Sequence, residues 1–276
     1  FELHPDYYQA DVSVLQMFQK AKEILDTYLP HTDILYSIEG PDFIKGPDEL
    51  EQLYQAGLDA IIVSWNTKSV YASGNRSDDG LTARGKELFQ KAITLGMGID
   101  LSHANQQTFQ DMIELIKEEQ EKGRSVCCYA SHSNSRKLCD QRRNLSDEQL
   151  IKLTEVGGNV GVLSNRNFVV QPDRRKKASQ QEKEDAYLEH IDHIMSIVGK
   201  NHVMVATDDM DFCKEADSEY GEVQIYPYAT VFKSMKQNLQ RKYDADTIYR
   251  ILYQNAKETI LTTIKNKRES KGVVTY

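Results

Sequence analysis

The sequence predicts an α/β fold of the (β/α)8 TIM-barrel type, and three observations support this. Short apolar runs alternate with long amphipathic, charge-rich segments along the whole chain, as repeated βα units require. Each run is short and apolar enough to form a parallel strand that is covered on both faces. No Gly/Ser-rich or Pro-rich linker interrupts the alternation. We therefore expect one domain over residues 1–276.

Six apolar runs are predicted as strands, at residues 34–39, 60–65, 97–103, 126–132, 159–164 and 203–208. Helices are predicted before, between and after them, at residues 10–29, 47–56, 82–95, 107–122, 146–156, 182–198 and 228–266. The predicted helix N-caps are Asp48, Thr82 and Ser146. Glycines that end helices in the left-handed conformation are predicted at Gly57, Gly96, Gly123 and Gly157.

The number of strands bears on the architecture. A closed barrel needs eight strands, so we expect its first one or two strands to be missing from this chain. A doubly wound open sheet is the rival architecture, but it normally has a glycine-rich phosphate-binding turn after an early strand. The sequence contains no such turn.

Composition excludes several classes of protein. Of the 276 residues, 39% are hydrophobic and 28% are charged, and the formal net charge is −8, which excludes a disordered chain and argues against a nucleic-acid partner. No apolar run approaches the roughly 20 residues of a membrane helix, so no membrane segment is expected. Free, buried thiols in a reducing, cytoplasmic compartment are expected because no CxxC spacing occurs among Cys127, Cys128, Cys139 and Cys213.

Four of the six apolar runs end on a side chain that can bind a metal ion or move a proton: Glu39, His103, His132 and Asp208. The carboxyl ends of parallel barrel strands meet on one face, so these side chains are expected around one pocket. Two neutral imidazoles and a carboxylate suit Zn²⁺ or a similar divalent ion, with an open position for water. The pattern therefore predicts a catalytic metal site.

The remaining histidines are interpreted differently. His190 and His193 lie three residues apart on a predicted helix, and packing on the helix surface is favoured over a metal pair. His31 and His202 border the starts of predicted strands, away from the carboxyl ends. We therefore leave these residues out of the predicted site.

Several motifs follow one another along the chain: Ser-Ile-Glu39-Gly, Gly80-Leu-Thr-Ala-Arg-Gly85, Leu95-Gly-Met-Gly-Ile-Asp-Leu-Ser-His103, the polar segment from Ser131 to Asn144, Gly157-Gly158, and His202-Val-Met-Val-Ala-Thr-Asp208. In order and spacing they resemble the membrane (renal) dipeptidase family of the amidohydrolase superfamily, over nearly the whole chain. The resemblance implies a (β/α)8 barrel with two Zn²⁺ ions that hydrolyses dipeptides, often with tolerance for a D-residue at the C-terminal position.

The resemblance also implies roles for individual residues. Glu39 matches the carboxylate that bridges the two metal ions, and His103 and His132 match the imidazoles of the second metal. Asp208 matches the catalytic aspartate that takes a proton from the attacking water and passes it to the leaving amine. Arg143 matches the arginine that binds the substrate carboxylate, a pairing that a guanidinium makes with two hydrogen bonds. The implied activity is zinc-dependent hydrolysis, in which metal-bound hydroxide attacks the amide carbonyl of the dipeptide.

The chain also departs from the family pattern. The first strand of the family ends in His-x-Asp, which completes the first metal site; here His4 and Asp6 have the right letters, but no strand is predicted before them. They are interpreted as loop residues, which leaves the ligands of only one metal site complete. Some relatives have a His that steadies the oxyanion where this chain has Trp65, which we expect to shape the substrate pocket or to pack in the barrel. The family usually continues Asp-Phe-Asp-Gly, so a shift of one residue would promote Asp209 in place of Asp208.

Two other functions stay open from the sequence. The same metal centre could act on another amide, a lactam or an ester, because the loops of a barrel set its substrate. A degenerate barrel that serves as a binding or scaffold protein is the non-enzyme alternative, and the missing His-x-Asp motivates it. The expected partner is a small dipeptide, and a homodimer is left open as the assembly.

Overall fold

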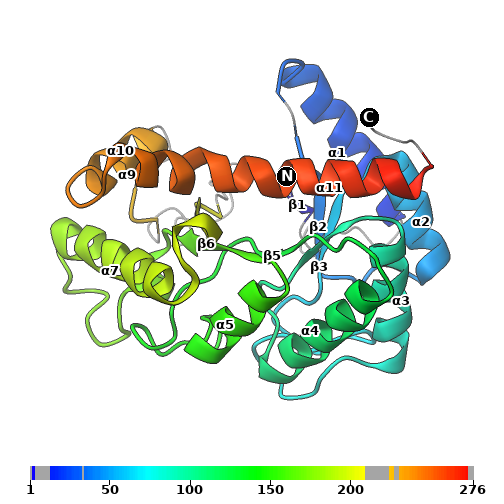
Figure 1. The fold of residues 1–276 in the computed structure, drawn as a ribbon, viewed down its shortest axis with the longest axis horizontal. Coiled ribbons are helices and arrows are strands. Elements are labelled where there is room, and N and C mark those ends of the chain that lie inside the picture. Colours follow the sequence, from blue (N-terminus) through cyan, green and yellow to red (C-terminus); the bar gives the residue numbers. More distant parts are fainter. Residues whose placement is uncertain (1, 4–12, 33, 209–223, 227–229, 273–276) are drawn as a thin grey trace. The chain divides into compact units, whose positions relative to one another are not determined.

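The computed structural model describes residues 2–3, 13–32, 34–208, 224–226 and 230–272 (Figure 1). The chain divides into two compact units. The first contains Phe1–Cys128 and Ile260–Tyr276, and the second contains Tyr129–Thr259. One domain over residues 1–276 stays a prediction.

Strands and helices alternate through the described part of the chain. The strands are β1 (Glu2–Leu3), β2 (Ser37–Glu39), β3 (Ala60–Ile62), β4 (Gly98–Asp100), β5 (Cys128–Ala130), β6 (Asn159–Leu163) and β7 (Val203–Ala206). The helices are α1 (Val14–Tyr28), α2 (Pro47–Ala56), α3 (Ala83–Thr94), α4 (Gln106–Glu121), α5 (Asp147–Glu155), α6 (Arg166–Val169), α7 (Gln180–Val198), α9 (Val231–Leu239), α10 (Ala245–Tyr249) and α11 (Asn255–Ser270). Two short turns complete the list, the 3₁₀ turn η2 (Lys200–His202) and the π-helical turn η5 (Arg250–Gln254).

The strands of the first unit are parallel and follow chain order. Ser37 of β2 lies opposite Glu2 of β1 on one side and opposite Ala60 of β3 on the other, and Ala60 lies opposite Gly98 of β4. Parallel neighbours need a crossover connection, which α1, α2 and α3 supply. The predicted α/β class with parallel strands is therefore confirmed.

Strand β1 corrects one expectation. We expected no strand before His4, but Glu2–Leu3 pairs in parallel with Ser37 and Ile38 of β2. A run of two residues is too short to show the alternation by which strands are recognised in a sequence. His4 and Asp6 themselves lie outside the described residues, so their interpretation as loop residues stays a prediction.

The strands of the second unit are also parallel. Tyr129 of β5 lies opposite Asn159 of β6, and β6 pairs with β7 from Val160 and Val203 to Leu163 and Ala206. All six predicted strands occur, but most are shorter than predicted at the carboxyl end. The polar residues there leave the hydrogen-bonded ladder and begin the βα loops, which is where functional side chains of such folds lie.

Local sequence signals explain most helix ends. Thr82 Oγ1 accepts from Gly85 N (3.0 Å) and Ser146 Oγ accepts from Gln149 N (3.2 Å), so both residues are N-caps as predicted. The prediction of Asp48 as an N-cap is wrong, because α2 begins one residue earlier at Pro47, whose fixed φ suits the first helical position. The four predicted helix-ending glycines have φ values between 72° and 117°.

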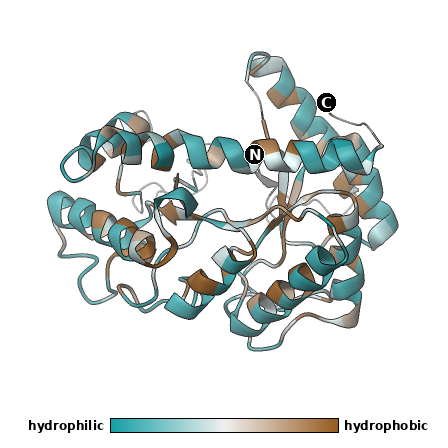
Figure 2. Ribbon diagram, viewed as in Figure 1, coloured by the Kyte–Doolittle hydropathy of each residue, from teal (hydrophilic) through white to brown (hydrophobic). Residues whose placement is uncertain are grey.

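Apolar residues fill the interior of the units. In Figure 2, brown hydrophobic residues and teal hydrophilic residues alternate along α3 and α4, as expected for helices with one buried face. The buried face of α3 includes Leu88 and Phe89, and that of α4 includes Phe109 and Met112. Among the described helices, none combines the length and the apolar character that a bilayer crossing requires.

The described cysteines agree with the sequence prediction. Cys127, Cys128 and Cys139 are free thiols and are buried. Burial raises the pKa of all three thiols, so they pack as small apolar groups and are poor nucleophiles. Cys213 lies outside the described residues.

Candidate functional site

The residues singled out by the sequence lie at the carboxyl ends of strands. Glu39 is the last residue of β2, and His103 follows β4 by three residues. His132 follows β5 by two residues, and Asp208 follows β7 by two. Glu39 and His103 belong to the first unit, whereas His132 and Asp208 belong to the second.

The first unit brings the side chains of Glu39 and His103 together. His103 Nε2 lies 3.1 Å from Glu39 Oε1, and the His103 and Glu39 side chains are 11% and 8% exposed. His103 has a left-handed backbone conformation, with φ 66°, which is uncommon for a residue other than glycine and typical of functional sites. A nitrogen and a carboxylate oxygen at this separation can share a proton or bind one metal ion.

Asn66 is a polar contact of His103 that was not predicted from the sequence. Asn66 Oδ1 lies 3.0 Å from His103 Nδ1 and accepts a hydrogen bond of 2.8 Å from Asn75 Nδ2. A signal for it existed, since Asn66 follows strand β3 by four residues and so obeys the same strand-end rule as the other site residues. From the sequence, a role in the site was predicted for the adjacent Trp65 instead.

Trp65 lies in the loop that follows β3 and is half-buried. Its backbone is closely packed: a Cβ on Gly74 would lie 1.5 Å from Trp65 O, and a Cβ on Gly40 would lie 3.2 Å from Trp65 N. Glycine is therefore required at position 74 for the chain to pass so near. This packing fixes the backbone from which both Trp65 and Asn66 extend.

In the second unit, His132 is buried and its backbone is fixed. His132 is 3% exposed, and its Nδ1 lies 2.5 Å from Ser131 Oγ. Ser133 N donates to Gly161 O (2.8 Å), and a Cβ on Gly161 would lie 1.8 Å from Ser131 O. The neighbours on both sides of His132 are thus held against β6.

Arg143 contacts the same loop as His132. Its side chain donates to His132 O through Nη2 (2.8 Å) and to Ser133 Oγ through Nη1 (3.0 Å). The residue is 7% exposed. These contacts use two N–H donors of the guanidinium, so Arg143 supports the His132 backbone. Its role in substrate binding stays a prediction.

Asp208 lies just beyond β7 in a left-handed conformation, with φ 48°. Gln224 Nε2 donates to Thr207 O (3.0 Å) and to Asp208 O (3.3 Å), so the backbone at the strand end is bound by a side chain. Ile225 N donates to Ser164 O (2.9 Å), which places the same segment at the end of β6. Asp209, the alternative in the sequence register, lies outside the described residues.

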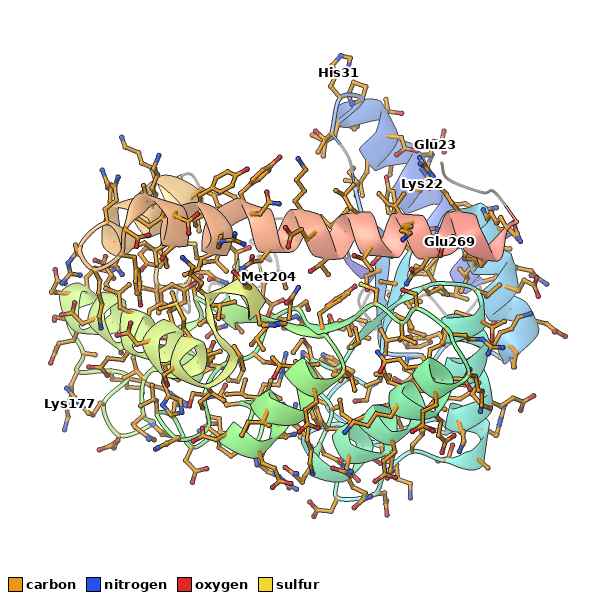
Figure 3. The ribbon with its side chains drawn as sticks, viewed as in Figure 1. Lys22, Glu23, His31, Lys177, Met204 and Glu269 are labelled. Atoms are coloured by element: carbon orange, nitrogen blue, oxygen red, sulfur yellow. The ribbon has the colours of Figure 1, made fainter. Side chains whose placement is uncertain are left out.

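Three other histidines, His190, His193 and His202, have polar contacts within the second unit. His190 is buried, not on the helix surface as expected: Ser135 N donates to its Nδ1 (3.1 Å) and its Nε2 lies 3.1 Å from Val169 O. His193 Nε2 lies 2.7 Å from an Asp147 carboxylate oxygen. His202 borders the start of β6 through Gly158 O (3.0 Å), and His31 is exposed beyond the end of α1 (Figure 3).

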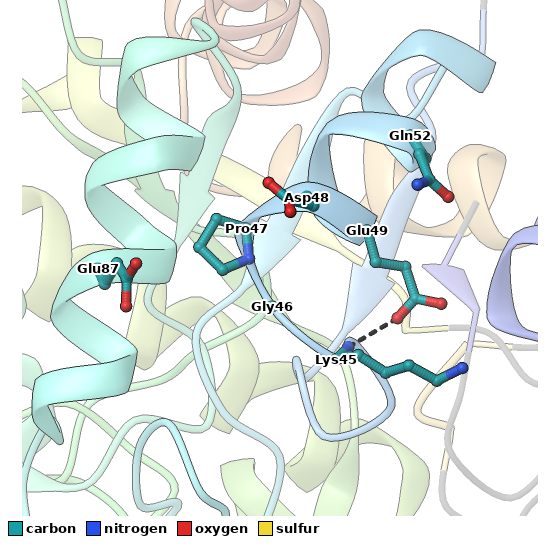
Figure 4. A pocket seen from close by; sticks show the side chains of 7 residues that line it. All are labelled: Lys45, Gly46, Pro47, Asp48, Glu49, Gln52 and Glu87. Carbon is teal, nitrogen blue, oxygen red and sulfur yellow. Dashed lines mark hydrogen bonds between the residues drawn. The ribbon is translucent and has the colours of Figure 1, made fainter.

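A separate pocket of about 550 Å³ lies at the start of α2 in the first unit (Figure 4). Its lining includes the carboxylates of Asp48, Glu49 and Glu87, and Glu49 accepts a hydrogen bond from Lys45 N (2.7 Å). None of the predicted site residues lines it.

A model of the family described as membrane dipeptidase (peptidase family M19) matches residues 6–271 of the chain. An uncharacterized protein of the pqqA 5′ region of Klebsiella pneumoniae is 32% identical over 180 residues, which is 62% of this chain and 62% of that protein. An uncharacterized dipeptidase of Schizosaccharomyces pombe is 28% identical over 227 residues, which is 80% of this chain and 51% of that protein. The chain thus spans about half to three-fifths of the length of these relatives.

Solved structures resemble the chain as well. A metallo peptidase from Rhodobacter sphaeroides, crystallised with a phosphinate mimic of the dipeptide L-Ala-D-Ala, has a TM-score of 0.68 at 24% identity and covers 83% of this chain and 63% of its own. This likeness shows the fold. The fold that this structure shares with the chain agrees with the α/β class predicted from the sequence.

Proposed function

Because the chain belongs to the membrane dipeptidase family, peptidase family M19, we propose that it is a metal-dependent hydrolase that cleaves the peptide bond of dipeptides. The observation that carries this proposal is a pair of largely buried atoms that can act as metal ligands at the strand ends of the first unit, His103 Nε2 and Glu39 Oε1, 3.1 Å apart. A buried carboxylate beside an imidazole is costly unless a proton or a cation lies between them. A divalent metal ion meets that requirement.

The donor chemistry fits zinc. Glu39, His103 and His132 each offer one ligand atom to a metal ion. We propose that His132 of the second unit completes the set with Glu39 and His103, and that it binds through Nε2, because its Nδ1 faces Ser131 Oγ. Two imidazoles and one carboxylate are a common ligand set of catalytic zinc, which keeps a further position open for water or substrate. A second ion, as the family resemblance implies, stays part of the proposal.

A divalent ion held by these residues would lower the pKa of a water molecule and polarise the scissile carbonyl. The residues of the chain supply the remaining functions. Asp208, at the end of β7, is proposed to accept a proton from the attacking water and to return it to the leaving amine. Its backbone is bound by Gln224, which limits its movement during the transfer.

Arg143 is proposed to bind the C-terminal carboxylate of the dipeptide. A guanidinium pairs with a carboxylate through parallel N–H groups. The contacts of Arg143 with His132 O and Ser133 Oγ place its side chain beside the proposed metal ligand His132. Selection of a free carboxylate would restrict the enzyme to short substrates with an unblocked C-terminus. Trp65 is proposed to line the substrate pocket. Because the Rhodobacter sphaeroides relative was crystallised with a mimic of L-Ala-D-Ala, we propose dipeptides with a C-terminal D-residue among the substrates.

The test is hydrolysis of dipeptides by the metal-free and metal-loaded chain. We expect turnover of Xaa-D-Ala or Gly-Xaa after addition of Zn²⁺, loss of turnover with a chelator, and recovery when the metal is restored. His132→Ala and Asp208→Asn are expected to abolish turnover, whereas His31→Ala, which changes an exposed histidine beyond α1, is the matched control. Unchanged rates in His132→Ala or Asp208→Asn would contradict the proposal.

The role of Arg143 is tested by blocking the substrate. The wild-type chain should have a higher kcat/KM for a free dipeptide than for its C-terminal amide. Arg143→Lys should raise KM for the free dipeptide and so reduce the difference in kcat/KM between the two substrates. Arg142→Lys changes the adjacent, exposed arginine and is the control. Equal loss of activity on both substrates in Arg143→Lys would show that Arg143 acts through the His132 loop alone.

A further inference from the structure

We propose that Asn66 is a positioning residue that holds His103 in its Nδ1-protonated form, so that Nε2 is presented to the metal, and that Asn75 sets the orientation of Asn66. The inference rests on the proposed metal-dependent function. It concerns residues of the first unit only.

The hydrogen bonds define the direction of each donor. Asn75 Nδ2 donates to Asn66 Oδ1 (2.8 Å), which identifies the atom of Asn66 that faces His103 as a carbonyl oxygen. A carbonyl oxygen only accepts, so at 3.0 Å the partner, His103 Nδ1, must carry the proton. In neutral imidazole the other nitrogen then holds the lone pair, and this is Nε2, which lies 3.1 Å from Glu39 Oε1.

Two acceptors therefore face each other when His103 is neutral. The lone pair of Nε2 and the carboxylate of Glu39 repel unless a cation lies between them, and both side chains are largely buried, so water screens this repulsion weakly. The same arrangement is favourable for a metal ion, which needs an unprotonated nitrogen and a carboxylate as ligands. Asn66 thus leaves His103 Nε2 unprotonated and ready to bind a metal ion. Neutral His103 then has no N–H group at Nε2 to donate to Glu39.

The loop that carries Asn66 and Asn75 is fastened to the turn that carries His103. Gly74 forms an antiparallel bridge with Ala104, the residue after His103. Ser73 N donates to Thr108 Oγ1 (3.1 Å), and Thr108 Oγ1 donates to Ser73 O (2.8 Å). The two amides and the imidazole therefore lie on backbone segments that are joined directly, which keeps their separation fixed.

A second side chain holds the far end of the same loop. Asn105 Nδ2 donates to Ser77 O and to Asp79 O, each at 2.7 Å. Asn105 also caps α4 by accepting from Thr108 N (2.8 Å). The loop after β3 is thus bound at Ser73 and again at Ser77 and Asp79 to the N-terminal end of α4, whose N-cap Asn105 lies two residues beyond His103.

Asparagine and aspartate have nearly the same shape but differ in hydrogen-bond donors. Exchanging one for the other therefore tests whether Asn66 and Asn75 set the protonated nitrogen of His103 or only fill space. Asn66→Asp keeps an acceptor opposite Nδ1, so His103 should keep its Nδ1 proton and metal affinity should be unchanged or higher. Asn75→Asp replaces the donor by an acceptor, so the Asn66 amide should reverse and present its NH₂ group to His103. Nδ1 then accepts and Nε2 becomes protonated, which is the form that cannot bind a metal ion. We expect Asn75→Asp to weaken metal binding about 10- to 100-fold, the usual effect of losing a partner behind a metal ligand.

The experiment has two readouts that do not depend on activity. Nitrogen-15 NMR of the imidazole rings in the metal-free chain reports which nitrogen of His103 is protonated, with the signal assigned from a His103→Gln sample. Chelator competition with Zn²⁺ gives the metal affinity at pH 8, where solvent-exposed histidines are neutral. Wild type and Asn66→Asp should show the Nδ1-protonated form, and Asn75→Asp the Nε2-protonated form with weakened zinc binding. Thr67→Ala, an exposed change in the same loop, should match wild type.

Several outcomes would overturn the inference. These are an Nε2-protonated His103 in the wild-type chain, zinc affinity in Asn75→Asp equal to that of wild type, or an equal loss of affinity in Thr67→Ala. A wild-type chain that binds no zinc while His103 carries its proton on Nδ1 would instead contradict the proposed function and support the hydrogen-bond assignment. The two failures can therefore be told apart.

Discussion

In the first unit, the Nδ1 atom of His103 faces the amide oxygen of Asn66, whereas in the second unit the Nδ1 atom of His132 faces the hydroxyl of Ser131. The amide is oriented by a further side chain, Asn75. The hydroxyl belongs to the residue adjacent to the histidine, and the backbone of that histidine is bound by Arg143. The two imidazoles are thus held by different means.

The difference shows which property each unit controls. An amide oxygen accepts but cannot donate, so it selects one protonation form of His103. A hydroxyl rotates and can donate or accept, so Ser131 adapts to either form of His132. In the second unit, control lies in the position of the backbone, which Arg143 and the close approach of Gly161 fix.

The largest expected effect comes from removing either imidazole. His103→Ala and His132→Ala should each lower kcat/KM for a dipeptide by about a thousandfold or more, because stabilisation by a metal ion is worth several kcal/mol. Steady-state kinetics with added zinc, with thermal unfolding as a check on folding, measures this. A large loss of kcat/KM in one variant and none in the other would contradict the proposal that each unit supplies a metal ligand.

The next largest effect is expected on the pH dependence of the free energy of unfolding, through His190 of the second unit. Burial lowers the pKa of His190 from 6.5 to about 4, and the neutral ring accepts from Ser135 N and lies against Val169 O. Between pH 6.5 and about pH 4, His190 binds a proton in the unfolded chain but not in the folded chain. The free energy of unfolding should therefore decrease as the pH falls through this range, by about 3 kcal/mol in total. Urea unfolding between pH 4 and pH 7.5 measures this dependence.

His190→Gln isolates the contribution of the buried ring. The amide of glutamine can accept from Ser135 N and donate to Val169 O, and it does not titrate, so stability should depend less on pH. His193→Gln is the matched control on the same helix, because His193 is only partly buried and pairs with Asp147. Unchanged pH dependence in His190→Gln would contradict the account of the second unit.

A smaller effect on stability and zinc binding is expected when alanine replaces a glycine that another backbone segment closely approaches. In Gly161→Ala the new Cβ would lie 1.8 Å from Ser131 O, and in Gly74→Ala it would lie 1.5 Å from Trp65 O. Each backbone must shift, which typically costs about 1–3 kcal/mol, and zinc binding should weaken because the displaced residues adjoin His132 and Asn66. Gly46→Ala, which places a Cβ in open space, is the control. Wild-type stability and zinc affinity in both variants would show that these contacts do not hold the ligands.

The smallest effect is expected from Ser131→Ala. Loss of one hydrogen bond should lower the free energy of unfolding by about 1 kcal/mol. The effect on zinc affinity should be smaller than that of Asn66→Ala, because the backbone and not the hydroxyl positions His132. Chelator competition on the two variants compares them directly. The reverse order would contradict the proposed difference between the units.

Much of the fold could be predicted from the sequence because its signals are local. Thr82 and Ser146 cap helices through their own side chains, and the apolar runs that become β6 and β7 are long enough to be recognised. Strand β1 was missed because two residues carry no pattern. The cap at Asp48 was misplaced because Pro47, one residue earlier, is better suited to begin the helix.

The candidate site was predictable only in part. Glu39 and His103 could be found because they follow apolar runs and have metal-binding chemistry. Asn66 follows an apolar run as the other site residues do, but neither Asn66 nor Asn75 could be given a role, since an amide has no distinctive chemistry until its partner is known. The burial of His190 was missed because its bonds to Ser135 and Val169 join residues distant in the sequence.

The central claim is that Glu39, His103 and His132 bind one metal ion. Anomalous diffraction from crystals grown with Zn²⁺, measured on both sides of the zinc absorption edge, tests it most directly. The account predicts a zinc peak about 2.0–2.2 Å from Glu39 Oε1, His103 Nε2 and His132 Nε2. A zinc peak that contacts none of these atoms, or a crystal without zinc at His103 and Glu39, would contradict it.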